Sequence, residues 1–570
     1  MKILLPALIG SLTLSGCLPT SVHEPITPKS DLAAINNLPH IHNQTVEATV
    51  AESEIITLGD KLDSDGDVIT YTVSASPNYT AGPNENQITY LNKQPGSEVL
   101  NIQATDGKSD PVSATLTINV TSENPSNYVI SRDVILPNFG STPPQKGETR
   151  TDPTTGAKIT RLTDVSELDG TSDALIVYSR YSPENTSGKY FLVFGSNSTS
   201  SWVIERETGN IVNKLQKHDA KTVGEYHEVR WDSSGNHPNR IYYRDGMGLY
   251  MIDDVSVKNP VATLIKNFAA DIPAATIIYN DVEGDSSNDS DHWAFMAAHY
   301  NGKTYIVDAF IHYQISTNTT HLMHPADLAG TNLDLEKDNT TFATQRPNMV
   351  EMSPLGTGVV IHSGRKWDDS SYGGNGKNYI GTWFDGPHLW PVDFDYTKQS
   401  PVKISVGETH SGWAFAEDGR EMFISQNNVE DYLDAVYING ENAGYDHRVR
   451  VAAHADFGWV GFHYGKVPAS KKGWLFISTY SNVSYTDHAT KWGVDQLIMM
   501  QIKPMKDNPV VWRINPNYNY YAGNYRDEAP AAMNYLGNRI YLTTNWGSAS
   551  NNREVYVISL PNDWDNPDHF

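Results

Sequence analysis

One pattern recurs seven times over the last three quarters of the chain. Each copy has a polar lead-in, a turn centred on Gly and then a strong strand, as in SPENTSGKYFLVFG and AAMNYLGNRIYLTTN. A single copy cannot bury its apolar face alone, so neighbouring copies must pack against one another. Seven units of about sixty residues predict a seven-bladed β-propeller. An eight-bladed ring, a large sandwich and a β-helix are the alternatives.

The composition supports an all-β fold. The 31 Tyr, 13 Trp and 15 Phe, together with 42 Gly, favour short strands joined by frequent turns, and no long run of period 3.6 indicates helices. The 42 Lys and Arg face 67 Asp and Glu, for a formal net charge of -25. We expect no nucleic-acid partner, because phosphate binding needs a basic surface. Because the chain is acidic overall, it can bind an anionic polymer only if the binding site itself contains Arg and His residues.

The first 17 residues have the form of a bacterial lipoprotein signal. Lys2 precedes an apolar stretch that is too short to span a bilayer. The run LSGC matches the lipobox and predicts cleavage before Cys17 and lipidation of its thiol. Cys17 is the only cysteine, so no disulfide forms within the chain. We expect residues 18–35, rich in Pro, Ser and Thr, to be a flexible tether.

Residues 36–122 have the alternation of a small β-sandwich. Apolar and polar positions alternate in segments such as VITYTVSAS and ATLTINVT. With the loops DSDGD and ATDGKSD, these segments resemble the cadherin-like modules of bacterial surface proteins. Acidic loops of this kind offer oxygen ligands for Ca²⁺, and plain Asp-Gly turns are the alternative. The candidate ligands are Asp63, Asp65, Asp67 and Asp106. We expect a linker at 123–135 and a catalytic propeller at 136–565.

Polar residues stand just before the strong strand of most copies. In a propeller the innermost strand of each blade runs along the central channel, so the residue that enters it lies at the channel mouth. A single histidine at this point is also explained as a structural residue, but several converging polar groups are costly to bury without partners. The sequence therefore predicts a polar funnel built from His227, His292, His410, His454, Tyr226, Arg180, Tyr181, Arg346, Asn348, Tyr525, Arg526 and Glu528.

The residue types in the funnel suit β-elimination of a uronate polymer. That reaction needs a group that neutralises the carboxylate and so lowers the pKa of the C5 proton, and then a base and an acid. Arg, or Asn with His, meets the first need, and His and Tyr meet the second. Glycoside hydrolysis needs two carboxylates at a fixed separation, which the sequence alone does not place. A third alternative is Mn²⁺, Zn²⁺ or Ca²⁺ held by histidines on facing strands. The chain has no GxSxG motif and no phosphate-binding loop.

Together, the lipobox, the cadherin-like module and a seven-bladed propeller with a His, Tyr and Arg funnel resemble the propeller polysaccharide lyases. The likeness is above all to the ulvan lyases of marine bacteria and more distantly to the oligogalacturonate lyases, over about residues 130–565. It implies that a His or Tyr removes the C5 proton and that Arg with a second polar group neutralises the carboxylate. Oligogalacturonate lyases also hold a metal by His and Gln. The likeness implies that His227 or His292 is the base or the acid and that Tyr226 or Tyr181 is its partner in proton transfer. It implies that Arg180, Arg346 or Arg526 neutralises the carboxylate. Whether His410 and His454 bind a metal is left open.

These features favour a lipid-anchored lyase that cleaves a uronic-acid-containing, ulvan-like polysaccharide by β-elimination. We assign catalysis to His227, His292, Tyr226 and Arg346, and substrate binding to the other funnel residues. A non-catalytic glycan-binding or scaffold propeller of a surface polysaccharide-uptake system, and a propeller glycoside hydrolase, are the alternatives.

We expect a monomer whose partners are the polysaccharide and, through the lipid, the membrane, with Ca²⁺ or another divalent metal as the cofactor. An aspartate directly after the lipidated cysteine commonly retains a lipoprotein at the inner membrane of the bacterial cell envelope. This chain has Leu18 at that position, so we expect the protein to be anchored to the outer membrane.

Overall fold

The computed structural model describes the chain from Asn36 to Phe570 with internal gaps. It forms two compact units: the first ends at Val120 and the second begins at Thr121 and also takes in Thr49–Glu52. The predicted lipidation site Cys17, the predicted Ca²⁺ ligand Asp65 and the predicted catalytic residue Arg346 lie outside the described residues. None of the described helices has the length and apolar character that crossing a membrane requires. The gaps are 37, 50–52, 65, 77, 83, 92–95, 122–127, 136–141, 177, 197–198, 303–304, 329–346, 364–385, 407–409, 459, 482–490, 522–524, 529 and 549–551.

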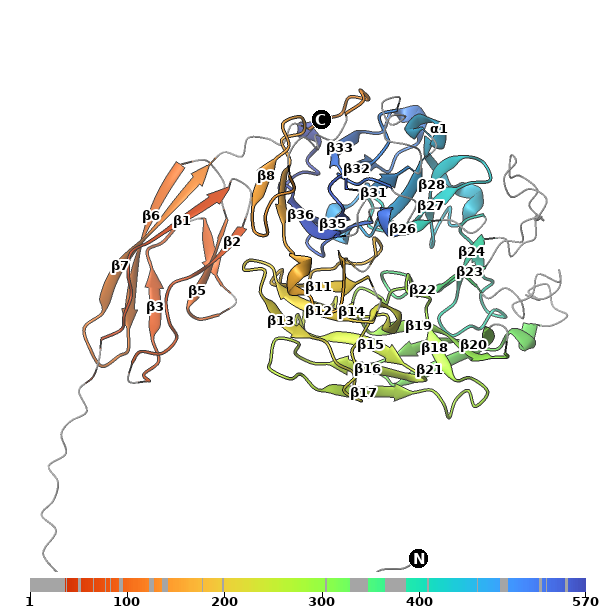
Figure 1. Ribbon diagram of the computed structural model, residues 1–570, viewed down its shortest axis with the longest axis horizontal. Coiled ribbons are helices and arrows are strands. Elements are labelled where there is room, and N and C mark those ends of the chain that lie inside the picture. The colour runs from red at the N-terminus through yellow and green to blue at the C-terminus, as the bar shows by residue number, and fades with distance from the viewer. Residues whose placement is uncertain are drawn as a thin grey trace, which may run out of the picture. The chain divides into compact units, whose positions relative to one another are not determined.

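The first unit, red to orange in Figure 1, consists of two antiparallel sheets. Each sheet buries one face, because residues two apart in a strand point to the same side. In β6 and β7 the buried positions are Leu100, Ile102, Ala104, Ala114, Leu116 and Ile118. The four-stranded sheet has the order β1 (Gln44–Thr49), β7 (Val112–Thr121), β6 (Gly96–Thr105) and β3 (Thr70–Val73); the other has β2 (Ser53–Thr57), β5 (Gln87–Leu91) and β4 (Tyr79–Ala81).

The second unit is a succession of seven small antiparallel sheets, which follow one another from yellow to blue in Figure 1. In the first six sheets, four strands pair in sequence order, so each sheet is a local meander. The first three are β10 (Ala174–Leu175), β11 (Tyr190–Gly195), β12 (Ser201–Glu205) and β13 (Ile211–Lys214); β14 (Arg230–Trp231), β15 (Ile241–Asp245), β16 (Gly248–Ile252) and β17 (Ala262–Asn267); and β18 (Ile277–Tyr279), β19 (His292–Tyr300), β20 (Tyr305–Gln314) and β21 (Thr319–Met323).

The remaining sheets keep the same plan. The next three are β22 (Val350–Met352), β23 (Val359–Ser363), β24 (Gly386–Trp390) and β25 (Val402–Lys403); β26 (Ser411–Phe415), β27 (Glu421–Asn427), β28 (Tyr432–Tyr437) and β29 (Val449–Ala453); and β30 (Gly461–Gly465), β31 (Trp474–Tyr480), β32 (Gln496–Gln501) and β33 (Val511–Pro516). The last sheet has the order β34 (Ala531–Met533), β35 (Arg539–Thr544), β36 (Glu554–Ser559), β9 (Lys158–Arg161) and β8 (Thr149–Thr151). The one α-helix of the described residues, α1 (His454–Phe457), is a single turn.

The last sheet joins the two ends of the second unit. Strand β9, near the start of the unit, pairs with β36 near its end, with Ile159 opposite Ile558 and Arg161 opposite Tyr556. First strands of successive sheets also pack together, β26 against β30 and β30 against β34. The all-β prediction is confirmed, and the closed succession of sheets is propeller-like.

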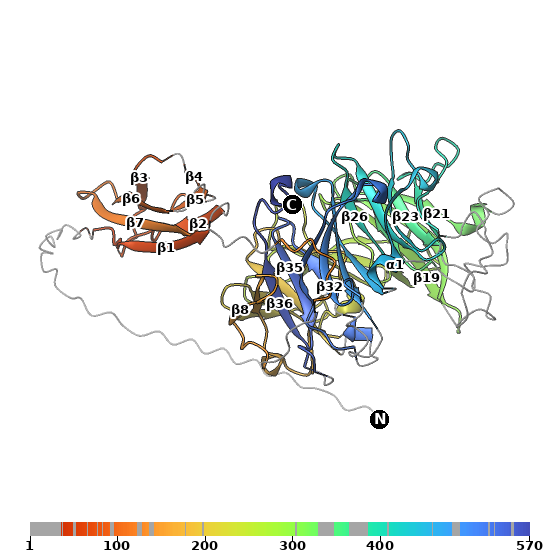
Figure 2. The same cartoon turned by 90° about the horizontal axis from the view of Figure 1, so that it is seen from above.

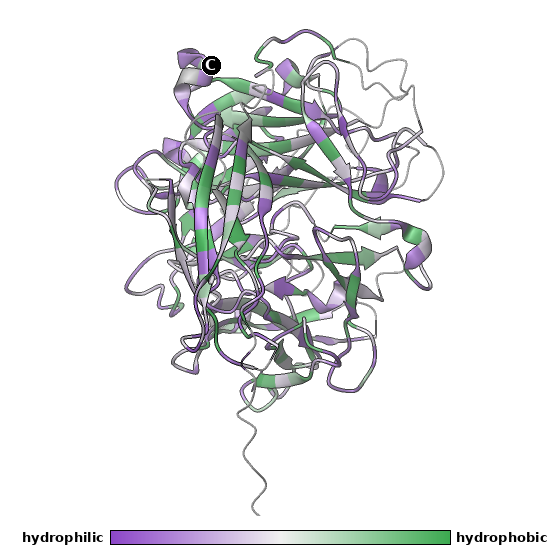
Figure 3. Ribbon diagram, turned by 90° about the vertical axis from the view of Figure 1, so that its left-hand side faces the viewer, coloured by the Kyte–Doolittle hydropathy of each residue, from purple (hydrophilic) through white to green (hydrophobic). Residues whose placement is uncertain are grey.

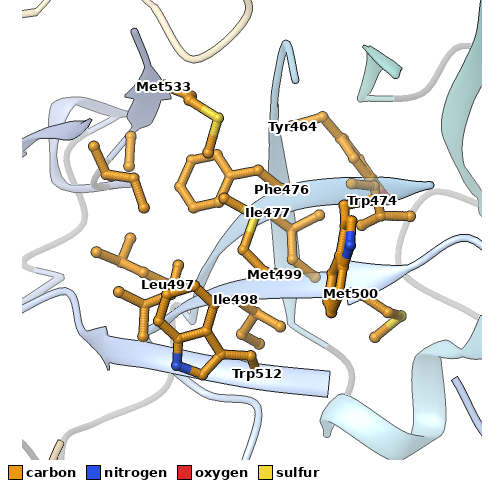
Figure 4. Close-up of a cluster of buried hydrophobic side chains, with 14 of the residues drawn as sticks. Tyr464, Trp474, Phe476, Ile477, Leu497, Ile498, Met499, Met500, Trp512 and Met533 are labelled. Atoms are coloured by element: carbon orange, nitrogen blue, oxygen red, sulfur yellow. The ribbon is translucent and has the colours of Figure 1, made fainter. Parts of the chain in front are cut away.

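Packing between sheets explains why many strands are apolar on both faces. Each sheet lies between two neighbours, so β31 buries six consecutive residues, Trp474–Thr479, instead of alternating. Figure 4 shows the resulting cluster, which holds Phe476, Met499 and Trp512 together with Met533 of the next sheet. Apolar residues, green in Figure 3, run along the strands, and polar ones gather in the loops.

A buried ion cluster connects three sheets across the centre of the second unit. Nη1 of Arg180, which follows β10, donates to the carbonyl oxygen of Ser411 in β26 (2.5 Å) and to its Oγ (2.6 Å). Nη2 of Arg180 bonds Oε1 of Glu351 in β22, which also bonds Nε2 of His362 (2.9 Å), and Oε2 accepts from Nε1 of Trp413 (3.0 Å). Burial alone would raise the pKa of the Glu351 carboxyl, but Arg180 and His362 outweigh it and hold the pKa at about 2. Arg180 is 2% exposed, so this predicted substrate-binding residue lies in the interior.

We expect Arg180→Met to lower the free energy of unfolding by about 3–5 kcal/mol, because it leaves the Glu351 charge buried without its cation. The urea midpoint of the full chain measures the change. Arg206→Met, at the exposed pair with Glu207 (3.3 Å), is the matched control and changes stability by less than about 1 kcal/mol. Equal, small effects of the two substitutions would show that the cluster does not hold the sheets together.

Candidate active site

Residues that lead into the first strands of different sheets meet at one end of the second unit. Glu225 lies in the short 3-10 helix η2 (Glu225–His227) before β14, His410 directly precedes β26, and Arg526 and Glu528 precede β34. Arg526 reaches Glu225, Nη2 to Oε2, at 3.1 Å, and the charge of Glu528 acts on His410. We call this end of the unit the entry face.

A hollow with about 370 Å³ of empty space, its open mouth included, lies in the entry face. Its wall mixes apolar side chains with a few polar ones, as is usual in sites for small ligands. Three of its polar residues, Tyr525, Arg526 and Glu528, come from the segment before β34, which includes the 3-10 helix η9 (Tyr525–Asp527). The lining residues are Leu175, Ile176, Tyr178, Glu225, His463, Tyr525, Arg526, Glu528, Pro530 and Thr543.

His463 is one of the two most deeply buried polar residues of this wall, at 1% exposure like Thr543. Its ring lies 4.8 Å from that of Tyr480, 5.1 Å from that of His410 and 5.3 Å, edge-on, from that of Tyr178. Within the described residues neither ring nitrogen has a hydrogen-bond partner, and Nε2 is 3.5 Å from Oε2 of Glu528. Burial lowers the pKa of His463 to about 3, so its imidazole is neutral at pH 7 and has a lone pair to offer.

The groups around His463 are also held in their neutral forms. Burial lowers the pKa of His410 to about 4, and a positive charge on His463 would lower it further. Burial raises the pKa of Tyr178 and Tyr480 above the ordinary value, and it also raises the pKa of the Glu528 carboxyl. The hollow therefore combines neutral imidazoles with phenols that keep their protons at pH 7.

The rim of the hollow carries a charged pair and the ring of Tyr525, and Tyr226 follows Glu225 in the chain. The guanidinium of Arg526 and the carboxylate of Glu225 form the pair, and both side chains are partly exposed. Tyr226 is 61% exposed and Tyr525 60%. Exposed rings beside polar groups are typical of surfaces that bind sugars, whose C–H faces pack on aromatic rings.

Four other predicted funnel residues lie elsewhere. His227 accepts a hydrogen bond at Nδ1 from the Gly224 N–H (3.0 Å) and places Nε2 3.8 Å from Asp245, so it caps η2 and does not line the hollow. Tyr181 is buried beneath the guanidinium of Arg230 at 3.5 Å. His454 is buried in α1 against Phe462, and His292 begins β19, the second strand of its sheet.

The sequence predicts His292 at the channel mouth because the apolar run Trp293–Phe295 follows it. The first strand of that sheet is instead the three-residue β18, and His292 bonds His312 through Nδ1 (2.9 Å) in a stack that continues to His321. Asn348 precedes β22 and donates its backbone N–H to the His362 carbonyl (3.0 Å). Of the predicted funnel, the structure thus brings Tyr525, Arg526 and Glu528 into the wall of the hollow and His410 into ring contact with His463, while Tyr226 follows Glu225 in η2 and does not line the hollow.

His463, Tyr178 and Tyr480 are not among the funnel residues that the sequence predicts. His463 lies inside β30 between the buried residues Phe462 and Tyr464. Because side chains alternate along a strand, a histidine between two core residues of a first strand faces the channel. That period-two signal was present in the run GFHYG.

Two groups of the described residues could hold a metal ion. Asp63, Asp67 and Asp106 in the first unit place carboxylate oxygens within 4.8 Å of one another, and so do Asp289 and Asp291 with a ring nitrogen of His292. In the first group Nζ of Lys108 already bonds both oxygens of Asp67, at 2.5 and 2.7 Å. A cation there would have to displace this ammonium group.

No protein-family model and no curated protein matches the chain. Solved structures similar to it include an oligogalacturonate lyase from Vibrio parahaemolyticus, at 11% identity over 74% of this chain and 100% of that one, with a TM-score of 0.46. An oligogalacturonate lyase in complex with manganese has 10% identity over 74% and 98%, and a TM-score of 0.45. The β-propeller domain of Cps50 (Swd1) from Myceliophteria thermophila has 11% identity over 67% and 96%, and a TM-score of 0.38. At these identities nothing about the chemistry of this chain follows from the likeness.

We expect His463 to make the protein less stable in mild acid. Its folded-state pKa of about 3 lies below the value of about 6.5 for an unfolded chain, so the unfolded state takes up the proton first and stability falls as the pH drops below 6.5. From pH 7 to pH 5 the free energy of unfolding of the wild type should fall by about 2 kcal/mol more than that of His463→Gln.

Urea unfolding of the full chain at a series of pH values measures this difference. His237→Gln, at an exposed histidine, is the control and keeps the wild-type slope. Parallel pH profiles for the wild type and His463→Gln would mean that His463 is charged in the folded protein.

Proposed function

We propose that the second unit is a seven-bladed propeller and that its entry face is the active site of a polysaccharide lyase, which cleaves a uronate polymer by β-elimination. The observation that carries this is the hollow in which neutral His463, protonated Tyr525 and the cation Arg526 share one space. Base, acid and carboxylate-binding group are the three functions that the reaction needs.

Arg526 is the group that neutralises the substrate carboxylate. Its planar guanidinium already holds one carboxylate, that of Glu225, at the rim, and a uronate competes for the same two-pronged donor. Placing a positive charge there withdraws electrons from C5 and lowers the pKa of the C5 proton. Glu225 in turn keeps the guanidinium oriented while the site is empty.

His463 removes the C5 proton and Tyr525 returns one. The lone pair of the neutral imidazole takes the proton, the electrons of the C5–H bond form the C4–C5 double bond, and the C4–O bond breaks. The leaving oxygen takes its proton from the phenol of Tyr525, whose raised pKa keeps it protonated until that moment. The exposed faces of Tyr226 and Tyr525 hold sugar rings on either side of the Arg526–Glu225 pair.

A hydrolase is the second candidate, and one observation favours it. Burial raises the pKa of Glu528, as a general acid requires, and Glu225 is a second carboxylate in the same hollow. Such an enzyme releases reducing ends and creates no double bond. A glycan-binding scaffold would retain the polymer and do neither.

The proposal also includes the substrate, the membrane anchor and the role of the first unit. The substrate is an ulvan-like, uronic-acid-containing polysaccharide, and lipid on Cys17 anchors a monomer to the outer membrane. The first unit serves as a cadherin-like spacer, with Ca²⁺ at Asp63, Asp67 and Asp106. The position of Lys108 on Asp67 makes that Ca²⁺ site weak unless the lysine moves away.

We expect the purified full chain to produce the ultraviolet absorbance of an unsaturated uronate from ulvan or polygalacturonate. His463→Ala should lower kcat at least about 100-fold, because it removes the base, and Tyr525→Phe should do the same by removing the acid. Arg526→Lys should mainly raise KM, because a lysine cannot reproduce the two-pronged contact.

His292→Ala, outside the hollow, is the control and keeps the wild-type rate. Reducing ends without new absorbance, lost in Glu528→Gln, would replace the lyase by the hydrolase. Polymer that is retained with neither product would leave only a binding role.

A further inference from the structure

A second hollow lies at the end of the last sheet that carries the entry face. Thr543, which lines the active-site hollow, is followed closely by Asn545 and Trp546, which line the second one. Thr544 pairs with Glu554 at the start of β36, and Tyr556 pairs with Arg161 at the end of β9. These strand ends therefore lie at the same end of the sheet, and the second hollow borders the same face as the first.

A hydrogen-bonded wall separates the two hollows. Asp527 stands between Arg526 and Glu528 of the active site, and its Oδ1 accepts from Nδ2 of Asn545 (3.3 Å) and from Nε of Arg553 (3.0 Å). Asp527 is 1% exposed and Arg553 3%. This buried charged pair and its hydrogen bonds join the segment before β34 to the segments that follow β35, so they set the distance between the two hollows.

The second hollow is large and mixes aromatic with polar groups. It holds about 730 Å³ of empty space, its open mouth included. Trp546 stacks on Tyr518 (4.3 Å between ring centroids) and on Tyr556 (5.2 Å), and this stack supplies one wall. Asp164, Ser166 and Asn552 supply hydroxyl, amide and carboxylate groups on the other sides. Such a set bonds sugar hydroxyls, which both donate and accept.

The charges of the second hollow select against an acidic ligand. Arg161 is its cation, and its guanidinium already donates to the carbonyls of Thr163 (2.7 Å) and Pro144 (3.2 Å) and to Glu554 (2.6 Å). The carboxylates of Asp164 and Glu554 remain on the wall, so the site is acidic overall. A uronate or a sulfate ester would meet repulsion and no free cation.

We infer that the second hollow binds a neutral sugar unit of the polymer whose uronate lies in the active site. The inference rests on the proposed function for the identity of the polymer, but the hollow itself requires only a neutral sugar. Two sites at a fixed distance on one face set the register of the chain, so that an uncharged unit in one presents an acidic unit to the other.

The test blocks the second hollow and leaves the first intact. Ser166 lies in the 3-10 helix η1 (Val165–Glu167), and its backbone N–H bond to Asp164 (3.0 Å) survives substitution. Ser166→Tyr fills the hollow, and Glu167→Tyr in the same helix, at a residue that does not line it, is the matched control. Saturation-transfer NMR of the full chain with neutral tetrasaccharides of xylose, glucose, galactose and mannose reads out binding without any need for catalysis.

We expect at least one of these tetrasaccharides to bind, with affinity about tenfold weaker in Ser166→Tyr and unchanged in Glu167→Tyr and His463→Ala. If a uronate polymer is turned over, Ser166→Tyr should also raise its KM without changing kcat. Binding lost in His463→Ala but kept in Ser166→Tyr would place the sugar in the active-site hollow and overturn the inference. Absence of binding by every neutral sugar would overturn it as well. Binding without lyase activity would refute the proposed function and leave the second hollow standing.

Discussion

The buried pair of Arg180 and Glu351 is the interaction on which the entry face depends. A guanidinium and a carboxylate in the interior must stay matched, so the segment after β10, strand β22 and strand β26 are held at one separation. Tyr178 lies two residues before Arg180, and His410 directly precedes Ser411, which accepts from the same guanidinium. Both edges of the hollow are thus attached to one charged cluster. The buried ion cluster therefore helps to fix the positions of the side chains around the hollow.

Burial does more than position these side chains, because it also sets their protonation. Two histidines and a glutamate are the groups here that change charge between mild acid and neutral pH, whereas tyrosines keep their protons in water as well. Burial lowers the pKa of His463 to about 3 and that of His410 to about 4, so both imidazoles stay neutral in mild acid. The charged pair of Arg526 with Glu225 lies at the rim, where both side chains are partly exposed. The hollow thus has neutral imidazoles in its interior and a charged pair at its edge.

More of the fold than of the candidate site could be predicted from the sequence. Strands that follow Gly-centred turns can be recognised in the sequence. Runs such as YFLVF of β11 are buried on both faces between neighbouring sheets, so they are apolar at every position. His410, Tyr525, Arg526 and Glu528 were found because they precede first strands. His292 failed because the short β18 was overlooked and the stronger β19 was taken for the first strand. His454 failed because the direction of its side chain depends on α1 packing against Phe462, a contact between sheets that no local pattern encodes.

The pairing of β9 with β36 has a consequence for biogenesis. Arg161 and its ion-pair partner Glu554 are 393 residues apart, so an early-synthesised strand waits for a partner that leaves the ribosome almost last. Until then its unpaired edge is open to other chains, and contacts of such long range form slowly. A truncated transcript or a premature stop near the C-terminus would leave this edge exposed for good, and such products are natural clients of chaperones and proteases.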